Sequence, residues 1–257
     1  MECEMFYDEK MDFTSYSEEL ERLAGLYDNV DLEVVGSSVE GRDIYRAHIH
    51  GDGAPVLVTA GHHGNEPAGP MAALNYIREA GENGSTLDIT MYPMVNPDGY
   101  EADQRENAHG VDLNRDYGFF KEPETLALIG SIDREDYIAA LDMHEAPRST
   151  KGFYVYESTP IREDIHLGQT AVDAVGEKHP ISWGVVRRDR PGCFRDFWAS
   201  RDAYAVTFEP PGTFEIVDRI DMELRALHAS LDLLEETTAD GSWDTYVASG
   251  DYVVAAP

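Results

Sequence analysis

The sequence contains few basic residues and very little lysine. Of its 257 residues, 50 are acidic and only 20 are Lys or Arg, which gives a formal net charge of −30. Lysine occurs at four positions, Lys10, Lys121, Lys151 and Lys178. A surface this negative repels nucleic acid and anionic membranes, so we expect neither as a partner.

The acidic residues are spread along the whole chain and form no acidic tail or block. A polyanionic surface that captures cationic ligands is one explanation. Adaptation to concentrated salt is the other, because screening by ions removes the self-repulsion of such a charge. The even spread favours the second explanation, and we expect a halophilic, archaeal source.

Cysteine is nearly absent as well, and long apolar runs are missing. Cys3 and Cys193 show no paired spacing, which argues against a zinc knuckle and a disulfide framework. The N-terminal residues lack the basic region and apolar core of a signal peptide, and no run approaches the length of a membrane span. We therefore expect a cytoplasmic protein.

What the chain does contain is a regular alternation of apolar strands with amphipathic helices. Two strands around a Gly/Ser turn are expected within 30–51, followed by strands at 55–60, 87–95, 137–143 and 203–209. Helices are expected over 14–28 with Thr14 or Ser15 as N-cap, over 70–80, from Pro123 onward, and over 221–239. This alternation predicts a single α/β domain over 1–257, built on a mixed, mostly parallel sheet.

Polar side chains follow each of the predicted strands. In open α/β sheets, ligands bind beyond the carboxyl ends of the strands. The side chains that stand at these ends are His62, His63, Glu66, Arg105, Asp112, Asn114, Arg115, His144 and Glu209. Because four separate strands deliver metal-binding or catalytic side chains to one crevice, their convergence predicts an active site.

The residue types in this set fit a catalytic zinc site. Such a site takes three protein ligands from His, Asp or Glu and keeps one position open. A His and a Glu three residues apart, in a turn that leads into a helix, supply two ligands, and a distant His supplies the third. Glu209 would remain as a free carboxylate that accepts a proton from water, while Arg105 and Arg115 suit charge stabilisation or carboxylate binding.

Each of these features has a simpler explanation when taken alone. A His-x-x-Glu pair occurs by chance, and helix starts often carry Glu. His48 and His50 alternate along one strand, and we interpret them as surface residues. Arg115 alone would be a solvated arginine. The order and context of the features together favour the active site.

Seven short stretches resemble one enzyme family. They are GSSVEGRDIY, GHHGNEP, VNPDGY, GVDLNRDY, EPET, LDMHE and VTFE, and they span roughly residues 36–209 in the family's order. With them the chain resembles the M14 zinc carboxypeptidases and the related succinylglutamate desuccinylase/aspartoacylase group. The resemblance implies a three-layer α/β/α sandwich around a mixed, mostly parallel sheet, and one zinc ion per chain.

The resemblance also implies the metal site and its catalytic carboxylate. His63 and Glu66 match the paired zinc ligands, and His144 matches the third ligand. Glu209 matches the glutamate that acts as general base and acid. Asp112 is similar to the carboxylate that orients a zinc-bound histidine. His62 is then left as a neighbour of the site that is not a ligand.

The same resemblance implies how substrate is held. Arg105 matches the arginine that polarises the scissile carbonyl, and Asn114 and Arg115 match the pair that binds the terminal carboxylate of the substrate. The family usually carries a tyrosine on a loop before the catalytic glutamate, yet no tyrosine occurs between 157 and 203. Tyr154 and Tyr156 are too close to His144 in sequence for us to expect them in that role.

The segment between His144 and Glu209 is short for a digestive carboxypeptidase, which favours small substrates. It contains a cluster of arginines that either bind an acidic substrate or are solvated, namely Arg187, Arg188, Arg190 and Arg195. The sequence thus predicts a zinc metallohydrolase that cleaves a small peptide or an N-acyl amino acid next to a free carboxylate.

Several alternatives remain open. Carboxypeptidase activity ranks first because of GSSVEGRDIY and EPET, and an N-acyl amino acid amidohydrolase ranks second. A non-catalytic metal-binding protein would not need Glu209, and a phosphoesterase would require a second metal and more carboxylates. The sequence sets neither the oligomeric state nor the role of 242–257, for which an edge strand and a subunit contact both stay open.

Overall fold

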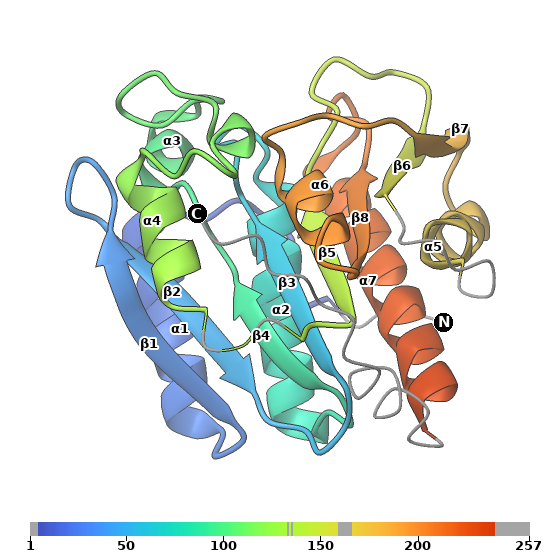
Figure 1. The fold of residues 1–257 in the computed structure, drawn as a ribbon, viewed down its shortest axis with the longest axis horizontal. Helices are drawn as coiled ribbons and strands as arrows, with labels where there is room; N and C mark the ends of the chain where they lie inside the picture. Colours follow the sequence, from blue (N-terminus) through green and yellow to red (C-terminus); the bar gives the residue numbers. More distant parts are fainter. Residues whose placement is uncertain (1–4, 133, 135, 159–165, 240–257) are drawn as a thin grey trace.

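The fold was examined in a computed structural model that describes residues 5–132, 134, 136–158 and 166–239 (Figure 1). Its strands are β1 (Val30–Ser37), β2 (Asp43–Ile49), β3 (Pro55–Ala60), β4 (Asp88–Tyr92), β5 (Ala139–Met143), β6 (Phe153–Ser158), β7 (Ile181–Arg187) and β8 (Tyr204–Glu209). Its helices are α1 (Phe13–Leu26), α2 (Ala68–Asn83), α3 (Pro97–Ala102), the 3-10 helix η1 (Leu113–Arg115), α4 (Pro123–Gly130), α5 (Leu167–Gly176), α6 (Phe194–Ala199) and α7 (Ile216–Thr238).

All eight strands form one mixed sheet in the order β1-β2-β4-β3-β5-β8-β6-β7. The four central strands β4, β3, β5 and β8 are parallel to one another. The flanking pairs join the centre antiparallel, β2 to β4 and β6 to β8. Because the central strands are parallel, the carboxyl ends of β3, β5 and β8 lie at one edge of the sheet, as the sequence predicted.

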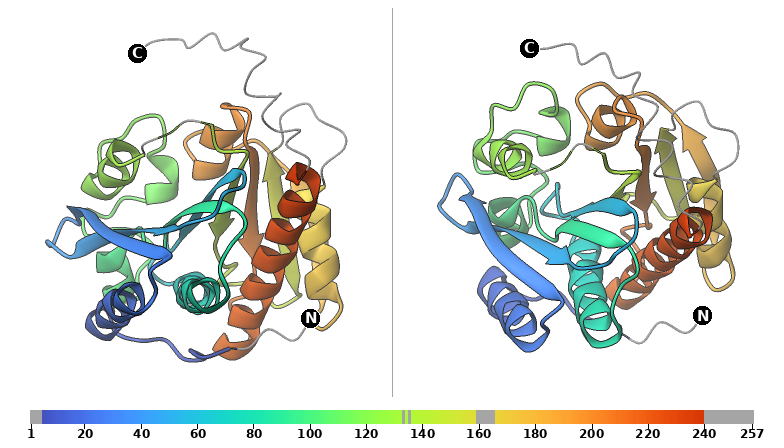
Figure 2. Two further views of the ribbon diagram at one scale, coloured as in Figure 1. Left: turned by 90° about the horizontal axis from the view of Figure 1, so that it is seen from below. Right: turned by 60° about the horizontal axis from the view of Figure 1, so that its bottom comes forward.

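Helices cover both faces of the sheet, so the predicted three-layer α/β/α arrangement is confirmed (Figure 2). Helices α1, α2, α5 and α7 lie on one face, and α4 and α6 lie on the other (Figures 1 and 2). Every residue of β3 and of β5 is buried, because both faces of these strands are covered. The largest part of the core lies between the sheet and α2 and α7, where Leu74, Leu224 and Leu227 are fully buried.

Most expected elements are present, with corrections at their ends. The N-cap of α1 is Asp12, whose side chain accepts a hydrogen bond from the Ser15 backbone, and not Thr14 or Ser15. The segment after β4, for which no helix was expected, contains α3. This helix begins because the Asn96 side chain accepts from the Gly99 backbone and Pro97 fits the first turn. Elements β6, α5, β7 and α6 were not predicted.

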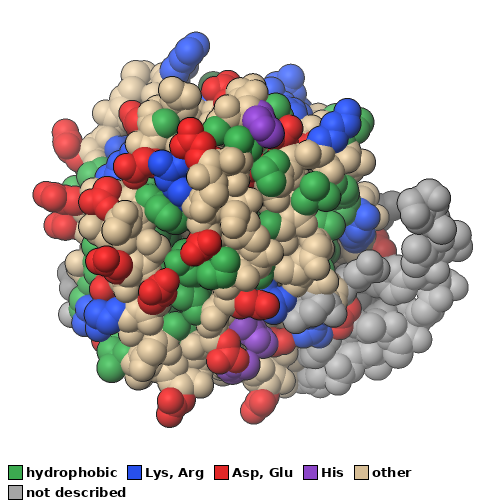
Figure 3. Space-filling model, turned by 90° about the vertical axis from the view of Figure 1, so that its left-hand side faces the viewer, with side chains coloured by type: hydrophobic (Ala, Val, Ile, Leu, Met, Phe, Trp, Pro, Cys, Tyr) green, Lys and Arg blue, Asp and Glu red, His purple; other side chains and the backbone are tan. Residues whose placement is uncertain are grey.

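The described surface shows no concentrated acidic block on the face drawn in Figure 3, where acidic and basic side chains are interspersed. Among the described residues, no helix combines the length and apolarity needed to cross a membrane. Cys193 is buried and has a free thiol. Cys3 and the segment 242–257 lie outside the described residues, and the assignment of 1–257 to a single domain stays a prediction.

Candidate active site

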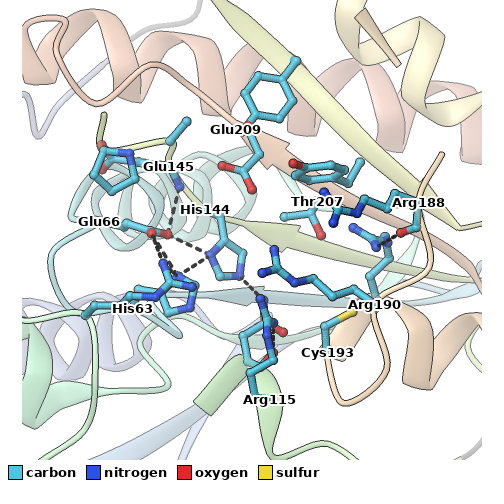
Figure 4. Close-up of a pocket in the computed structure, with 17 residues that line it drawn as sticks. His63, Glu66, Arg115, His144, Glu145, Arg188, Arg190, Cys193, Thr207 and Glu209 are labelled. Atoms are coloured by element: carbon cyan, nitrogen blue, oxygen red, sulfur yellow. Dashed lines mark hydrogen bonds and ion pairs between the residues drawn. The ribbon is translucent and has the colours of Figure 1, made fainter. Parts of the chain in front are cut away.

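Three side chains converge at the carboxyl ends of β3 and β5 (Figure 4). His63 Nδ1 lies 2.9 Å from Glu66 Oε1, and His144 Nδ1 lies 2.8 Å from Glu66 Oε2. The two Nδ1 atoms are 3.0 Å apart. All three side chains are buried. The structure thus brings together the three predicted zinc ligands, with one nitrogen of each imidazole facing the same carboxylate.

The turn between β3 and α2 holds two of these side chains because small residues let the backbone fold tightly. Gly61 adopts a φ of 68°, a conformation that L side chains rarely adopt. A Cβ on Gly64 would lie 1.8 Å from the carbonyl carbon of Gly99, so only glycine allows α3 to pack against this turn. The Asn96 backbone N–H donates to the Gly61 carbonyl, which ties the turn to the chain after β4.

Carboxylates hold the outer nitrogen of each histidine. His63 Nε2 lies 3.0 Å from Asp112 Oδ1, and His144 Nε2 lies 2.8 Å from Asp142 Oδ2. Such contacts fix the orientation and the proton position of imidazoles whose other nitrogen binds a metal. The predicted position of Asp112 beside a zinc-binding histidine matches the structure. Asp142, which plays the equivalent part for His144, was missed.

The signal for Asp142 was present in the sequence. Side chains two residues apart on a strand point to the same face, so the LDMHE pattern would have placed Asp142 beside His144. Asp142 is fully buried, and the histidines His144 and His62 outweigh the effect of burial and lower the pKa of its carboxyl. A charged Asp142 therefore lies in the buried layer of side chains beneath the predicted zinc ligands.

His62 lies in the same buried layer, and each of its two ring nitrogens contacts a neighbouring side chain. Nδ1 lies 2.9 Å from Asp142 Oδ1, and Nε2 lies 2.6 Å from the Tyr117 hydroxyl. Its ring stacks on that of His144 with centroids 5.5 Å apart. His62, Asp142 and His144 also lie close enough to hold an ion, but His63, Glu66 and His144 line the pocket and His62 and Asp142 do not.

The donor set and its electrostatics fit zinc. Burial alone would raise the pKa of Glu66, but His63 and His144 outweigh it and lower the pKa to about 2. Burial opposes protonation of His144, yet the Asp142 and Glu66 carboxylates raise its pKa well above the usual value. A divalent cation would take the place of the proton on His144, because metal ligands bind in their deprotonated forms. Two imidazoles and one carboxylate are a usual set for catalytic zinc.

Glu209 ends β8 and lines the same pocket. Its carboxylate makes no hydrogen bond within the described part of the chain. Burial and the nearby Glu66 and Asp142 carboxylates raise the pKa of Glu209 to about 8, against the opposing effects of His144 and Arg105. A cation at the neighbouring ligands would favour its charged form. The position suits the predicted general base, and that role stays a prediction.

Arg105 lies against the ligands from the loop after α3. Its Nη2 donates to Asp112 Oδ2 at 2.9 Å, and its Nη1 lies 3.4 Å from Glu66 Oε1. The guanidinium is about one third exposed, at 35%. It therefore lies where a carbonyl oxygen bound near the ligands would meet a positive charge, and the predicted role of Arg105 stays a prediction.

Asn114 and Arg115 also line the pocket, but they differ in how they are held. The Asn114 Oδ1 accepts from the Phe194 backbone at 2.8 Å, and its Nδ2 lies 2.9 Å from His144 Nε2. Arg115 is held mainly through a hydrogen bond from its Nη1 to the Asn114 carbonyl. Arg115 thus offers the rest of its guanidinium to the pocket, whereas Asn114 is largely engaged with the protein.

The remaining wall of the pocket comes from β6 and from the segment between β7 and α6. Tyr154 and Tyr156 on β6 line it, although we did not expect them here. The sequence distance from His144 misled us, because β6 pairs antiparallel with β8 and places Tyr154 opposite Glu209. Burial and the nearby Glu209 carboxylate raise the pKa of the Tyr154 phenol, so it stays a hydrogen-bond donor. The pocket has a volume of about 200 Å³.

Comparisons with known proteins agree with this geometry. Residues 16–209 match the zinc carboxypeptidase family, peptidase family M14. The chain is 31% identical to carboxypeptidase D of Anas platyrhynchos over 159 residues, which cover 49% of this chain and 11% of that protein. It is 30% identical to mouse carboxypeptidase M over 146 residues, which cover 44% of this chain and 33% of that protein.

Solved structures show the same fold. Carboxypeptidase A from Helicoverpa armigera superposes with a TM-score of 0.74 at 18% identity, over 91% of this chain and 75% of that one. A metallo-carboxypeptidase from Burkholderia cenocepacia gives a TM-score of 0.73 at 16% identity, over 90% and 71%. The family match extends over most of the chain and includes the turn at His63 and the end of β8. The chain therefore belongs to the zinc carboxypeptidase family of metallohydrolases.

Proposed function

We propose that the protein is a carboxypeptidase that hydrolyses the amide bond next to a free carboxylate in small peptides. The observation that carries this proposal is the composition of one pocket. The three ligands His63, Glu66 and His144, the carboxylate of Glu209 and the guanidinium of Arg115 all line it. A site with a metal, a base and a carboxylate-binding cation fits a substrate that ends in a carboxylate.

In this proposal one zinc ion binds to His63, Glu66 and His144. When bound, zinc acts as a Lewis acid toward water and toward the scissile carbonyl. Asp112 and Asp142 would hold the two imidazoles by Nε2, with the Nδ1 atoms facing Glu66.

The protein groups then carry out the remaining tasks. Glu209 accepts a proton from the attacking water and transfers it to the nitrogen of the departing amine, so that the C–N bond breaks and the carboxyl group keeps the water oxygen. Arg105 stabilises the negative charge that develops on the carbonyl oxygen. Arg115, assisted by Asn114, binds the terminal carboxylate and so selects the last amide bond.

The second candidate is an N-acyl amino acid amidohydrolase of the succinylglutamate desuccinylase/aspartoacylase type. It needs the same carboxylate grip and the same metal. The pocket volume of about 200 Å³ favours it as much as a short peptide, because ligand pockets for larger molecules exceed about 300 Å³. The two candidates differ only in what lies on the acyl side of the scissile bond.

A hydrolysis panel separates the candidates. N-blocked dipeptides, N-acetyl amino acids and N-succinyl amino acids are incubated in molar KCl, with and without a chelator. We expect release of the C-terminal amino acid from the dipeptides, lost with chelator and restored by added zinc. Hydrolysis confined to N-acyl amino acids would favour the second candidate, and no metal-dependent hydrolysis would contradict both.

A further inference from the structure

The pocket wall that faces the metal ligands is rich in arginine. Five of the sixteen arginines in the chain line this one pocket, Arg105, Arg115, Arg188, Arg190 and Arg195. The proposed mechanism uses Arg105 and Arg115. Arg188 and Arg190 come from the segment between β7 and α6 and lie on the right in Figure 4, away from Glu66 and His63 on the left, and Arg195 lies in α6. In a chain with a net charge of −30, five arginines around one pocket indicate that the pocket binds an anionic ligand.

Arg195 is the buried member of this group, with a side chain only 5% exposed. Its Nε donates to the Ser158 hydroxyl at 2.8 Å, and its Nη2 donates to the Arg188 carbonyl at 2.7 Å and to Asp196 Oδ1 at 3.1 Å. These contacts leave Nη1 without a hydrogen-bond partner among the described residues. A buried guanidinium that is held by the protein but keeps a free donor is prepared to bind an anion.

The acidic residues of the pocket do not neutralise this wall. Glu66 is bound between the two histidines, and Glu145 accepts from the Ala68 backbone and from Arg219. Glu209 lies at the metal end. These are the acidic side chains that line the pocket in the described part of the chain. Asp196 pairs with Arg195 from outside the pocket lining.

Arg195 is placed to meet the side chain of the residue that is released. The Arg195 guanidinium lies over the Tyr156 ring, 5.2 Å from its centroid, and Tyr156 pairs with Thr207 across the sheet. Thr207 precedes Glu209 by two residues on β8, so both side chains point to the same face about 7 Å apart. If the scissile bond lies beside Glu209, the side chain of the released C-terminal residue extends toward Thr207 and Arg195. The length of an Asp or Glu side chain suits this position.

We propose that the preferred substrates end in an acidic residue, glutamate or aspartate, and that Arg195 is the residue that determines this specificity. This inference rests on the proposed function, because it requires a C-terminal amide to be cleaved in this pocket. Arg115 binds the terminal carboxylate and Arg195 binds the side-chain carboxylate. The exposed Arg188 and Arg190 add positive potential at the entrance.

The test compares N-blocked dipeptides that differ only in the last residue, Glu, Gln, Leu or Lys. Glu and Gln have nearly the same shape, so their ratio of kcat/KM isolates the charge. We expect the wild-type enzyme to favour Glu over Gln by about 100-fold, because the Gln peptide offers no charged acceptor to the Nη1 donor of the buried Arg195. The preference should persist at high KCl, since salt screens a buried contact much less than an exposed one.

Two variants locate the preference. Arg195→Gln should lower kcat/KM for the Glu peptide about 100-fold while the Leu peptide is cleaved as before, which also shows that the variant folds. Arg187→Gln is the matched control. It removes one charge from the same segment at a side chain that is 70% exposed, pairs with Glu157 and does not line the pocket. The control should keep the wild-type ratio.

A measurement on the wild-type enzyme avoids any dependence on variant folding. Free glutamate should inhibit cleavage of the Leu peptide at much lower concentration than free glutamine. Equal inhibition, or equal cleavage of the Glu, Gln and Leu peptides, would overturn the acidic preference and leave the carboxypeptidase proposal intact. Failure to cleave any dipeptide would instead contradict the proposed function.

Discussion

The two ends of the pocket are built in different ways. At the metal end, His63, Glu66 and His144 follow strands at the centre of the sheet, and each makes at least one further contact, with Asp112, the Glu145 backbone and Asp142, respectively. At the arginine end, Arg188 and Arg190 are exposed on the connection between β7 and α6. The proposed chemistry thus rests on the sheet, and the proposed substrate selection rests on Arg195 of α6 and on the connection before it.

Because of this difference, we expect residues at the arginine end to tolerate substitution without loss of the metal site. Substituting a ligand disturbs a network in which both nitrogens of His63 and of His144, and both oxygens of Glu66, have partners. Substituting an arginine of the connection removes one positive charge, and no carboxylate that lines the pocket is paired with that charge in the described part of the chain. The following predictions test the division, from the largest expected effect to the smallest.

The largest effect is expected for His63→Ala. Loss of one of three ligands should remove zinc and with it essentially all hydrolysis. His62→Ala is the control, and it should retain zinc with an affinity lowered by at most about 10–100-fold, because His62 acts through Asp142. Zinc is measured by elemental analysis after gel filtration. The opposite pattern, with zinc lost only from His62→Ala, would assign the ion to His62, Asp142 and His144.

Glu209→Gln separates catalysis from metal binding at the same end. The variant should bind zinc as the wild type does but hydrolyse peptides about 10²–10⁴-fold more slowly, because the amide cannot accept the proton of water. Zinc content and kcat are measured on the same preparation. Wild-type kcat in a variant with full zinc content would refute Glu209 as the general base.

Arg115→Gln probes the boundary between the two ends. We expect KM to rise about 10–100-fold for peptides with a free terminal carboxylate, the usual cost of a lost charged hydrogen bond. Peptides with an amidated C-terminus should be affected little, so the preference for the free acid should shrink. Arg22→Gln, on the surface of α1 beside Glu19, is the control. An unchanged preference would assign the carboxylate to another arginine.

The smallest effect on activity is expected for Glu223→Gln, a change behind the metal end. Glu223 on α7 is fully buried, and neither carboxylate oxygen has a hydrogen-bond partner among the described residues. Burial and the nearby Glu145 and Glu209 raise the pKa of Glu223 well above its usual value. The folded state thus holds a proton that the unfolded chain releases near pH 4.5.

The sign of the effect follows. The stability that protonated Glu223 contributes is fully present below about pH 4.5 and is lost as pH rises through the folded-state pKa. Glu223→Gln cannot ionise. The difference between its Tm and that of the wild type should therefore increase by about 3–6 °C for each pH unit between about pH 4.5 and the folded-state pKa of Glu223. Differential scanning calorimetry measures the difference, with the exposed Glu236→Gln as control. A constant difference across pH would refute the buried proton.

The sequence predicted the metal end well because the relevant signals are local. The spacing of His63 and Glu66 in one turn, and the positions of His144 and Glu209 after apolar strands, follow from strand and helix patterns within short windows. The central strands were found because each is a short apolar run, fully buried on both faces. The N-cap of α1 was missed by a few residues, as is usual at helix ends.

The arginine end could not be predicted in this way. The segment from 144 to 203 contains β6, α5, β7 and α6, none of which was expected. Tyr154 and Tyr156 were set aside because of their short sequence distance from His144. Only the antiparallel pairing of β6 with β8 shows that they lie beside Glu209. Proximity across a sheet depends on strand order, which a single sequence does not state.

By itself, then, the sequence determined the α/β fold through periodicity and the family through its short motifs, and it named candidate zinc ligands through their spacing and the family resemblance. Tertiary structure alone decided what His62 contacts beneath the site and which arginine is buried in the pocket wall. Arg187, Arg188, Arg190 and Arg195 are equivalent as letters in the sequence. Packing of α6 against β8 and the contacts of Arg195 with Ser158 and Asp196 separate one of them from its neighbours.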